Sequence, residues 1–323
     1  MAKLQDKMLK DEKWFEKEPF GAFWEKGYRD MSVSTMGGPS FEVIEIAPAL
    51  PVNAKVLDLG CGEGRNSYFL ASAGFDVTAI DRSEAGIRKL STISSINKIS
   101  LSGIVSDIGR LEINEDYDLI MSHGCLYYLS NMEWRELLTQ AKEHTKPGGF
   151  NIYTVFVFND EYPRTEEFKS ARYAHSFAPN ELREFYEDWD IFRYDVYVKW
   201  DKHPGIPLHY HPIEKLVARK PGGSGKKVVI ENVLVKSETM KWDNFESIFM
   251  GMKTEELIGL CGKPDNIVSY KTNEMQMGAF DATVNKYFLS LWFYGNTSIY
   301  VMNNEVCGKS LNHTKPITLK VAD

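Results

Sequence analysis

The chain has 323 residues and a formal net charge of -7. A single hydrophobic core rarely extends beyond about 250–300 residues, so two domains are expected. The acidic balance, without a basic stripe, disfavours nucleic acid as a partner. The first 20 residues lack the apolar core of a signal peptide, and no apolar run is long enough to span a bilayer. We therefore expect a cytoplasmic protein with no membrane partner.

The cysteines lack the paired spacing that a metal site needs; they are Cys61, Cys125, Cys261 and Cys307. A reduced set in a cytosolic protein is the simpler account. No metal site is therefore predicted from them.

The stretch "VLDLGCGEGRNS", residues 56–67, is an apolar run that ends in three closely spaced glycines. It predicts a buried parallel strand, a tight turn and a helix that ends near Gly74. Glycine lets the main chain approach a ligand closely, and a helix N-terminus presents unpaired amide donors. We expect this turn, with Gly60, Gly62 and Gly64, to contact a ligand. A glycine-rich turn without a ligand is the alternative.

Two cofactors use such a turn, and the neighbouring residues distinguish them. A dinucleotide fingerprint has glycine or alanine three places after its second glycine, where this chain has Arg65. Asp58 comes just before the turn, where a carboxylate would repel a pyrophosphate but suits a cationic amino group. The turn therefore favours S-adenosylmethionine over a dinucleotide, and a dinucleotide-dependent oxidoreductase is kept as a rival.

Polar residues follow the next predicted strands. The strand over residues 74–81 ends at Asp81, at the distance where an acidic residue can reach a nucleoside ribose. A third strand ends at Asp107, whose carboxylate is placed to accept from an adenine amino group while Ile108 packs on the ring. A fourth strand ends at His123, which either faces cofactor and acceptor or is a buried histidine bonded to backbone. Helix caps and solvated turns are the alternative for each acid.

Strands and helices alternate up to about Lys220. Helices are predicted over residues 132–149 and 178–189, and strands over 149–158, 191–198 and 214–220. This alternation predicts an α/β fold with a doubly wound, mostly parallel sheet. Residues 221–227 are glycine-rich and basic, as in a linker. Residues 228–323 then show strand-like runs, such as 285–294 and 298–310, and a helix over 252–264, a pattern typical of a small α+β domain.

Several motifs together resemble those of the TehB-like (tellurite-resistance type) class I methyltransferases. They are "FWEKGYRDMSVSTMGGPS", "VLDLGCGEGRNS", "VTAIDRSEAGI", "YDLIMSHGCLYYL", "TKPGGFNIYTVF" and "NELREFYEDWDIFRYD". The resemblance covers about the first two-thirds of the chain. It implies a seven-stranded Rossmann-like methyltransferase domain over residues 1–220, with an N-terminal helical cap over 1–50 and S-adenosylmethionine as cofactor. The cofactor residues implied by turn and resemblance are Tyr28, Arg29, Asp58, Gly60, Gly62, Gly64, Arg65, Asn66, Asp81, Arg82, Asp107, Ile108 and His123.

The resemblance also implies in-line methyl transfer to a small soft nucleophile, such as a tellurite- or selenite-type oxyanion or a thiol. An anionic acceptor needs cationic partners, and the connection after the fifth strand supplies Arg164, Arg172 and His175, with His123 as a further catalytic candidate. A solvated charged loop is the alternative. The segment from 199 to 212 matches the family poorly, and its histidines, His203, His209 and His211, lack the partners of a closed metal set.

The C-terminal runs "GMKTEELIGLCGKPD" and "WFYGNTSIYVMNNEVCG" resemble the SmpA/OmlA-like (BamE-like) module. This resemblance implies a shape, with a docking, homodimerising, substrate-covering or stabilising role. A methyltransferase for another small metabolite and a non-catalytic S-adenosylmethionine sensor are the alternative functions.

Overall fold

The computed structural model describes residues 22–31, 38–164, 174–203, 206–223, 225–235, 240–249, 251–271, 288–302, 304–312 and 314–322. Within these ranges no helix is long and apolar enough to cross a membrane.

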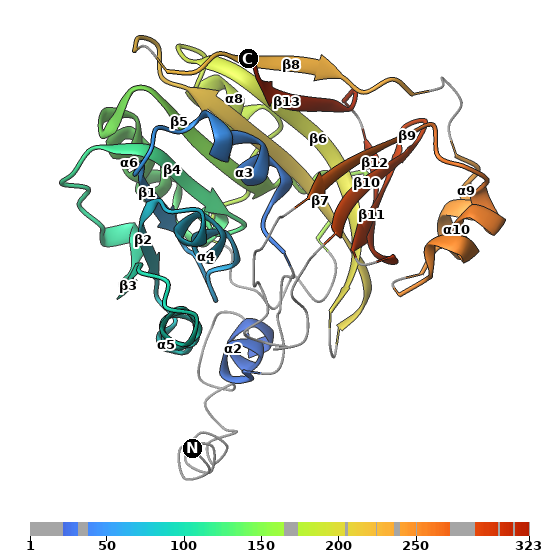
Figure 1. The fold of residues 1–323 in the computed structure, drawn as a ribbon, viewed down its shortest axis with the longest axis horizontal. Coiled ribbons are helices and arrows are strands. Elements are labelled where there is room, and N and C mark those ends of the chain that lie inside the picture. The colour runs from blue at the N-terminus through green and yellow to red at the C-terminus, as the bar shows by residue number, and fades with distance from the viewer. Residues whose placement is uncertain are drawn as a thin grey trace.

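The first seven strands form a mostly parallel sheet, as the alternating sequence pattern predicts. They are β1 (Lys55–Leu59), β2 (Asp76–Asp81), β3 (Ser102–Val105), β4 (Tyr117–His123), β5 (Thr145–Phe156), β6 (Asp190–His203) and β7 (Ile206–Arg219). Their order in the sheet is β3-β2-β1-β4-β5-β7-β6 (Figure 1). The pairs among β1 to β5 are parallel, and β7 runs antiparallel to both β5 and β6. The predicted fold class is therefore confirmed.

Helices cover both faces of this sheet because apolar side chains alternate along its central strands. On β4, Leu119 and Met121 enter a core with α3 (Phe41–Ile46) and α4 (Arg65–Ser72). Ile120, between them, enters the opposite core with α6 (Asn131–Glu143) and α8 (Glu181–Phe185). A fifth helix, α5 (Glu84–Ile96), packs beside α4 and β2. Successive strand residues point to opposite faces, so each strand serves both layers.

Four C-terminal strands continue the same sheet. They are β9 (Asn266–Lys271), β10 (Phe288–Tyr294), β11 (Thr297–Met302) and β12 (Glu305–Asn312), all paired antiparallel. β12 pairs with residues 197–200 of β6, so the sheet has eleven strands (Figure 1). The strand-like run over 298–310 is two strands, joined at Asn304 with a positive φ of 65°. The β6–β7 hairpin, which includes the segment that matches the family poorly, thus provides the edge on which the C-terminal strands build.

A separate two-stranded sheet lies over α3. It consists of β8 (Val228–Asn232) and β13 (Ile317–Val321), and Figure 1 shows both strands above that helix. Val228 and Leu319 are buried in the same core as Val43 and Ile46 of α3. The predicted linker, residues 221–227, lies between β7 and β8, and the two-domain division remains a prediction. The C-terminal region nevertheless contributes apolar side chains to the core of the N-terminal region.

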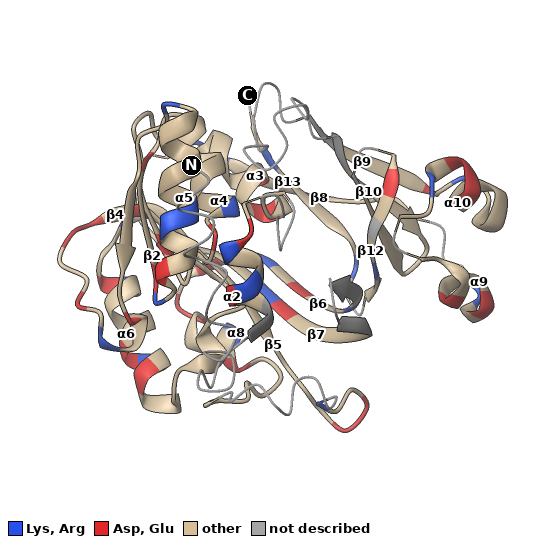
Figure 2. Ribbon diagram, turned by 90° about the horizontal axis from the view of Figure 1, so that it is seen from below, with Lys and Arg blue, Asp and Glu red and all other residues tan. Residues whose placement is uncertain are grey.

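Two helices precede the C-terminal strands, α9 (Trp242–Ser247) and α10 (Thr254–Cys261). The helix predicted over 252–264 is α10, whereas α9 was not predicted. Figure 2 shows acidic and basic positions interspersed along the ribbon, for instance on α6, rather than gathered into one basic stripe among the coloured residues.

Candidate active site

The turn between β1 and α4 has a backbone that only glycine adopts easily. Gly60, Gly62 and Gly64 have φ values of 73°, 59° and 82°. A Cβ atom at Gly60 would lie 2.3 Å from Cys125 Sγ, and one at Gly62 would lie 2.4 Å from the Tyr28 hydroxyl. The turn is therefore closely surrounded by side chains from distant parts of the chain.

Asp58 is buried at the end of β1, directly below this turn. Its Oδ2 accepts a hydrogen bond of 2.6 Å from Ser67 Oγ of α4. Burial raises the pKa of Asp58 to about 6, although the bond from Ser67 acts in the opposite direction. Burial disfavours the ionised form of this carboxyl group, so a cation bound beside Asp58 would stabilise its negative charge.

Asp81 ends β2 and reaches back to the glycine turn. Its Oδ2 accepts from Gly62 N at 2.7 Å and its Oδ1 accepts from Ser83 N at 2.8 Å. Burial raises the pKa of Asp81 despite these two bonds. The structure thus brings Asp58 and Asp81 to the same turn, with Arg82 next in the chain after Asp81.

A short N-terminal helix, α2 (Ala22–Arg29), lies over the turn. Besides the contact of Tyr28 with Gly62, Lys89 Nζ of α5 donates to Gly27 O at 2.9 Å and to Glu63 at 2.7 Å. Burial raises the pKa of Tyr28 well above its usual range, with the charge of Asp81 as the next cause. Arg29 Nε lies 3.7 Å from Glu25 Oε1 on the same helix. Tyr28 therefore reaches the glycine turn, while Arg29 pairs with Glu25 within α2. Contact of both residues with the cofactor stays a prediction.

The third and fourth strands contribute an apolar wall. Asp107 caps the 3₁₀ turn η3 (Ile108–Arg110), accepting from Gly109 N at 3.0 Å. Ile108 is buried, and its Cδ1 lies 3.9 Å from where a Cβ at Gly60 would be. Cys125, just after β4, lies closer still to Gly60, with its Sγ 2.3 Å from the same Cβ position. Cys125 was not predicted to belong to the site, because the spacing of the cysteines carries no signal for it.

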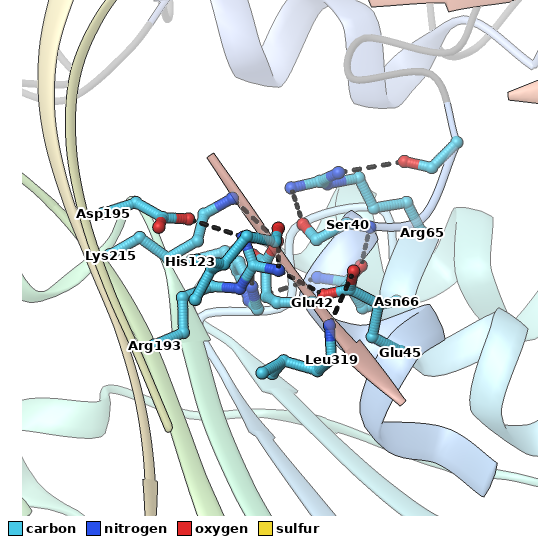
Figure 3. Close-up of polar contacts among 12 residues, drawn as sticks. Ser40, Glu42, Glu45, Arg65, Asn66, His123, Arg193, Asp195, Lys215 and Leu319 are labelled. Carbon is cyan, nitrogen blue, oxygen red and sulfur yellow. Dashed lines mark hydrogen bonds and ion pairs between the residues drawn. The ribbon is translucent and has the colours of Figure 1, made fainter. Parts of the chain in front are cut away.

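His123, at the end of β4, lies in a buried hydrogen-bond network (Figure 3). Its Nε2 lies 2.8 Å from Glu42 Oε1, and its Nδ1 lies 3.2 Å from Asn66 Nδ2. Asn66 Oδ1 accepts from Ser40 N at 2.8 Å, which orients the amide so that Nδ2 donates to His123. His123 therefore carries its proton on Nε2 and donates it to Glu42.

Electrostatic interactions with Lys215 and His123 stabilise the ionised form of Glu42 in this network. Burial would raise the pKa of Glu42, but the Lys215 ammonium at 2.7 Å and the bond from His123 hold that pKa well below its usual range. Burial lowers the pKa of His123, although Glu42 acts against it. The network thus consists of a charged Glu42, a charged Lys215 and a neutral His123. Both ring nitrogens of His123 are engaged inside the protein.

Arg65 and Asn66 fasten the segment before α3 to the glycine turn. Arg65 donates to Gly38 O at 2.9 Å and to Ser40 Oγ at 2.8 Å. Arg65 and Asn66 were predicted to lie in the cofactor site, whereas Glu42 and Lys215 were not predicted. Two glutamates three residues apart, among the apolar residues of "FEVIEI", were the available signal for carboxylates on a buried helix face.

The predicted acceptor residues are not all brought together. The Arg164 guanidinium lies 5.8 Å from the centre of the Phe158 ring, and Arg172 lies outside the described residues. The backbone N of His175 donates to Tyr127 O at 3.2 Å. The His175 ring packs on the Trp134 ring, with 5.7 Å between ring centres. His175 Nε2 lies 3.0 Å from Glu181 Oε2. The acceptor role of these residues remains a prediction.

The histidines of the β6–β7 hairpin lie near the end of β5. His209 and His211 are buried with ring centres 4.6 Å apart, and Phe156 stacks on His211 at 4.8 Å. The side chain of His203 is outside the described set. Among the described residues, no three His, Cys, Asp or Glu side chains are placed to hold a metal ion.

Known proteins resemble the chain over its N-terminal part. A probable S-adenosyl-L-methionine-dependent methyltransferase TehB from Haemophilus influenzae is 36% identical over 141 residues, which are 44% of this chain and 48% of that protein. Hemagglutinin 1 from Eikenella corrodens is 33% identical over 171 residues, 52% of this chain and 55% of that protein. The chain therefore spans about half the length of these curated relatives.

The fold is also similar to a solved structure. The crystal structure of TehB from Haemophilus influenzae matches with a TM-score of 0.51 and 28% identity, covering 61% of this chain and 66% of that chain. The family model described as tellurite resistance protein TehB matches residues 28–201, from Tyr28 of α2 to within β6. That match is more than half of the sequence, and the chain belongs to the TehB family.

Proposed function

We propose that the chain is an S-adenosylmethionine-dependent methyltransferase that acts on a small molecule. The observation that carries the proposal is the meeting of Asp58, Asp81 and Tyr28 at the glycine turn. A buried carboxyl with a raised pKa suits the ammonium of the methionine end. Asp81 suits the ribose hydroxyls, and Ile108 offers an apolar surface to the adenine. Membership of the TehB family supports the same cofactor.

A dinucleotide fits this site less well. A pyrophosphate would lie against the turn that Asp58 and Asp81 both approach, and like charges repel. Calorimetry on ligand-free protein tests the choice. We expect S-adenosylmethionine and S-adenosylhomocysteine to bind and NAD not to bind. Affinity for NAD without affinity for S-adenosylmethionine would overturn the proposal.

Methyl transfer from S-adenosylmethionine does not require a general acid or a general base. S-adenosylmethionine supplies the methyl group, which passes in line to the acceptor while the positive charge on sulfur disappears. The protein mainly has to hold both partners close and exclude water. α2 covers the turn, and both nitrogens of His123 are engaged with Glu42 and Asn66. This supports an acceptor that arrives already nucleophilic and needs no general base.

A tellurite- or selenite-type oxyanion, or a thiol, is the acceptor class that we propose. Arg164, Arg172 and His175 follow the fifth strand, where acceptor loops lie in such sheets, and they would face an anion with positive charge or hydrogen-bond donors. A screen of small acceptors that scores S-adenosylhomocysteine release tests this class. We expect Arg164→Ala, Arg172→Ala and His175→Ala to lower turnover of oxyanions. Turnover of neutral amines alone would reject the acceptor class and leave the methyltransferase class intact.

A further inference from the structure

The C-terminal strands contact helix α3 at both of its ends. At the start of the helix, the Phe41 ring lies 5.8 Å from the Tyr300 ring of β11, measured between ring centres. Near its end, Glu45 Oε1 accepts from Leu319 N of β13 at 3.4 Å. α3 is only six residues long. Residues that follow it by more than half of the chain therefore help to define its position.

Arg193 of β6 joins α3 to β13. Its guanidinium donates to Glu45 Oε2 at 2.6 Å, to Ile317 O at 3.0 Å and to Asp195 Oδ2 at 2.7 Å (Figure 3). Arg193 and Glu45 are both buried. A planar, permanently charged group that bonds three partners fixes their relative positions, which a lysine would not do.

The same helix reaches the glycine turn through Glu42. Glu42 holds His123, His123 accepts from Asn66, and Asn66 belongs to the first turn of α4. Ser40, immediately before α3, bonds both Asn66 and Arg65. A displacement of α3 would therefore pull on the first turn of α4, directly after the glycines.

Charge balance makes this cluster sensitive to change. Within the group drawn in Figure 3, the carboxylates and cations are equal in number: Glu42, Glu45, Asp195, Arg65, Arg193 and Lys215. Removing Glu45 takes one of two carboxylates from the buried Arg193 guanidinium, and removing Arg193 takes that cation from the buried Glu45. A change at Glu45 or Arg193 is therefore expected to shift α3 relative to β6 and β13.

We propose that β11 and β13 set the affinity for the cofactor by seating α3 against α4, with Glu45 and Arg193 as positioning residues. This rests on the proposed function, because the affinity concerned is that for S-adenosylmethionine. The coupling must be reciprocal, since whatever lets the C-terminal strands tighten cofactor binding also lets the cofactor stabilise those strands. The C-terminal region thus acts on the site without touching the cofactor.

Affinity measurements on full-length variants test the proposal. We expect Glu45→Gln and Arg193→Lys to weaken S-adenosylhomocysteine binding by about fivefold or more, within the usual range for coupled sites. Lys320→Ala is the matched control on β13, because Lys320 pairs with Glu231 of β8 at the surface, where both side chains are about half exposed or more. If a variant at Glu45 does not fold, Tyr300→Leu tests the other end of the helix. Unchanged affinity in folded variants would overturn the proposal.

Hydrogen exchange separates coupling from simple structural support. Adding S-adenosylhomocysteine should slow amide exchange in residues 317–321 more than in β9, and Glu45→Gln should abolish that difference. Equal effects on both strands would reject the coupling. If the unaltered chain binds neither S-adenosylmethionine nor S-adenosylhomocysteine, the proposed function fails as well. Binding without slower exchange in β13 overturns the coupling alone.

Discussion

His123 and Glu42 share a hydrogen bond of 2.8 Å although they are 81 residues apart in the sequence. The bond spans the site: His123 ends β4, and Glu42 belongs to a helix that crosses the same face of the sheet. The other oxygen of Glu42 accepts from Lys215 of β7. Three elements that are distant in the chain are therefore joined by one carboxylate.

Glu42→Gln should destabilise the protein by about 3–5 kcal/mol, because it takes the paired carboxylate from the Lys215 ammonium, whose side chain is only 12% exposed. Unfolding in urea, followed by circular dichroism, measures the loss. Adding Lys215→Met should recover most of it, since replacing both members of a buried pair is often nearly neutral. A double variant no more stable than Glu42→Gln would contradict this account.

Asp58 should make the ligand-free protein less stable as pH rises. Its pKa is 3.8 in an unfolded chain and about 6 in the folded one, so between these values only the folded state keeps the proton. The free energy of unfolding should therefore fall by about 2 kcal/mol from pH 4 to pH 6, out of about 3 kcal/mol for the whole titration, and level off near pH 7. Burial lowers the pKa of His123, which acts in the opposite direction.

Asp58→Asn isolates the effect of that carboxyl group. Urea unfolding from pH 4 to pH 8 should show the variant gaining stability relative to the parent as pH rises to 6. The same variant should bind S-adenosylmethionine more weakly at pH 7, and binding to the parent should tighten as pH rises through about 6. A constant stability difference across this range would show that Asp58 is already ionised at pH 4.

Gly86→Ala should weaken cofactor binding from outside the glycine turn. An added Cβ would lie 2.6 Å from the carbonyl oxygen of Gly62, so the turn would have to move. Gly259→Ala on α10 is the matched control, because nothing lies within 4 Å of its Cβ position. The control should stabilise the helix by about 0.5–1 kcal/mol and leave binding unchanged. Calorimetric titration of both variants with S-adenosylhomocysteine measures the difference, and equal affinities would refute the prediction.

Leu319→Ala should destabilise the protein by about 2–5 kcal/mol, because Leu319 is only 4% exposed within the core beneath β13. Ile230→Ala is the control: Ile230 is the register partner of Leu319 on β8 but is 49% exposed. The loss in free energy of unfolding caused by Ile230→Ala should be less than half of that caused by Leu319→Ala. Thermal unfolding should show one transition that shifts as a whole, since Leu319 shares its core with α3. A separate early transition in Leu319→Ala would instead indicate an independent C-terminal domain.

The parallel strands and the glycine turn were predictable because their signals are local. An apolar run followed by glycines marks the end of β1, and Asp81 follows its strand at the spacing expected of a neighbouring strand end. The parallel topology then brings Asp58 and Asp81 to one turn, whereas the approach of Tyr28 was implied only by the family resemblance. The alternation of strand and helix predicted a mostly parallel sheet, whereas the order of its strands and the antiparallel direction of β7 were not predicted from it.

The contacts that could not be predicted join segments without a shared local pattern. Glu42 and Lys215 are 173 residues apart, and nothing near either one indicates that α3 crosses the sheet between β4 and β7. The pairing of Leu311 with Val198 is likewise invisible, because backbone hydrogen bonds at a sheet edge leave no signature in the side chains. The sequence pattern of residues 228–323 indicated a small separate α+β unit, whereas strands β9 to β12 extend the sheet formed by β1 to β7.

The pairing of β12 with β6 also affects how strongly the protein tends to self-associate. β6 is 14 residues long, and without β12 it would end the sheet as an open edge, with free backbone groups ready to pair with another molecule. Fragments that stop near Lys220 should therefore self-associate in solution even if each copy folds. The C-terminal strands protect the protein from aggregation in the same place where they enlarge its sheet.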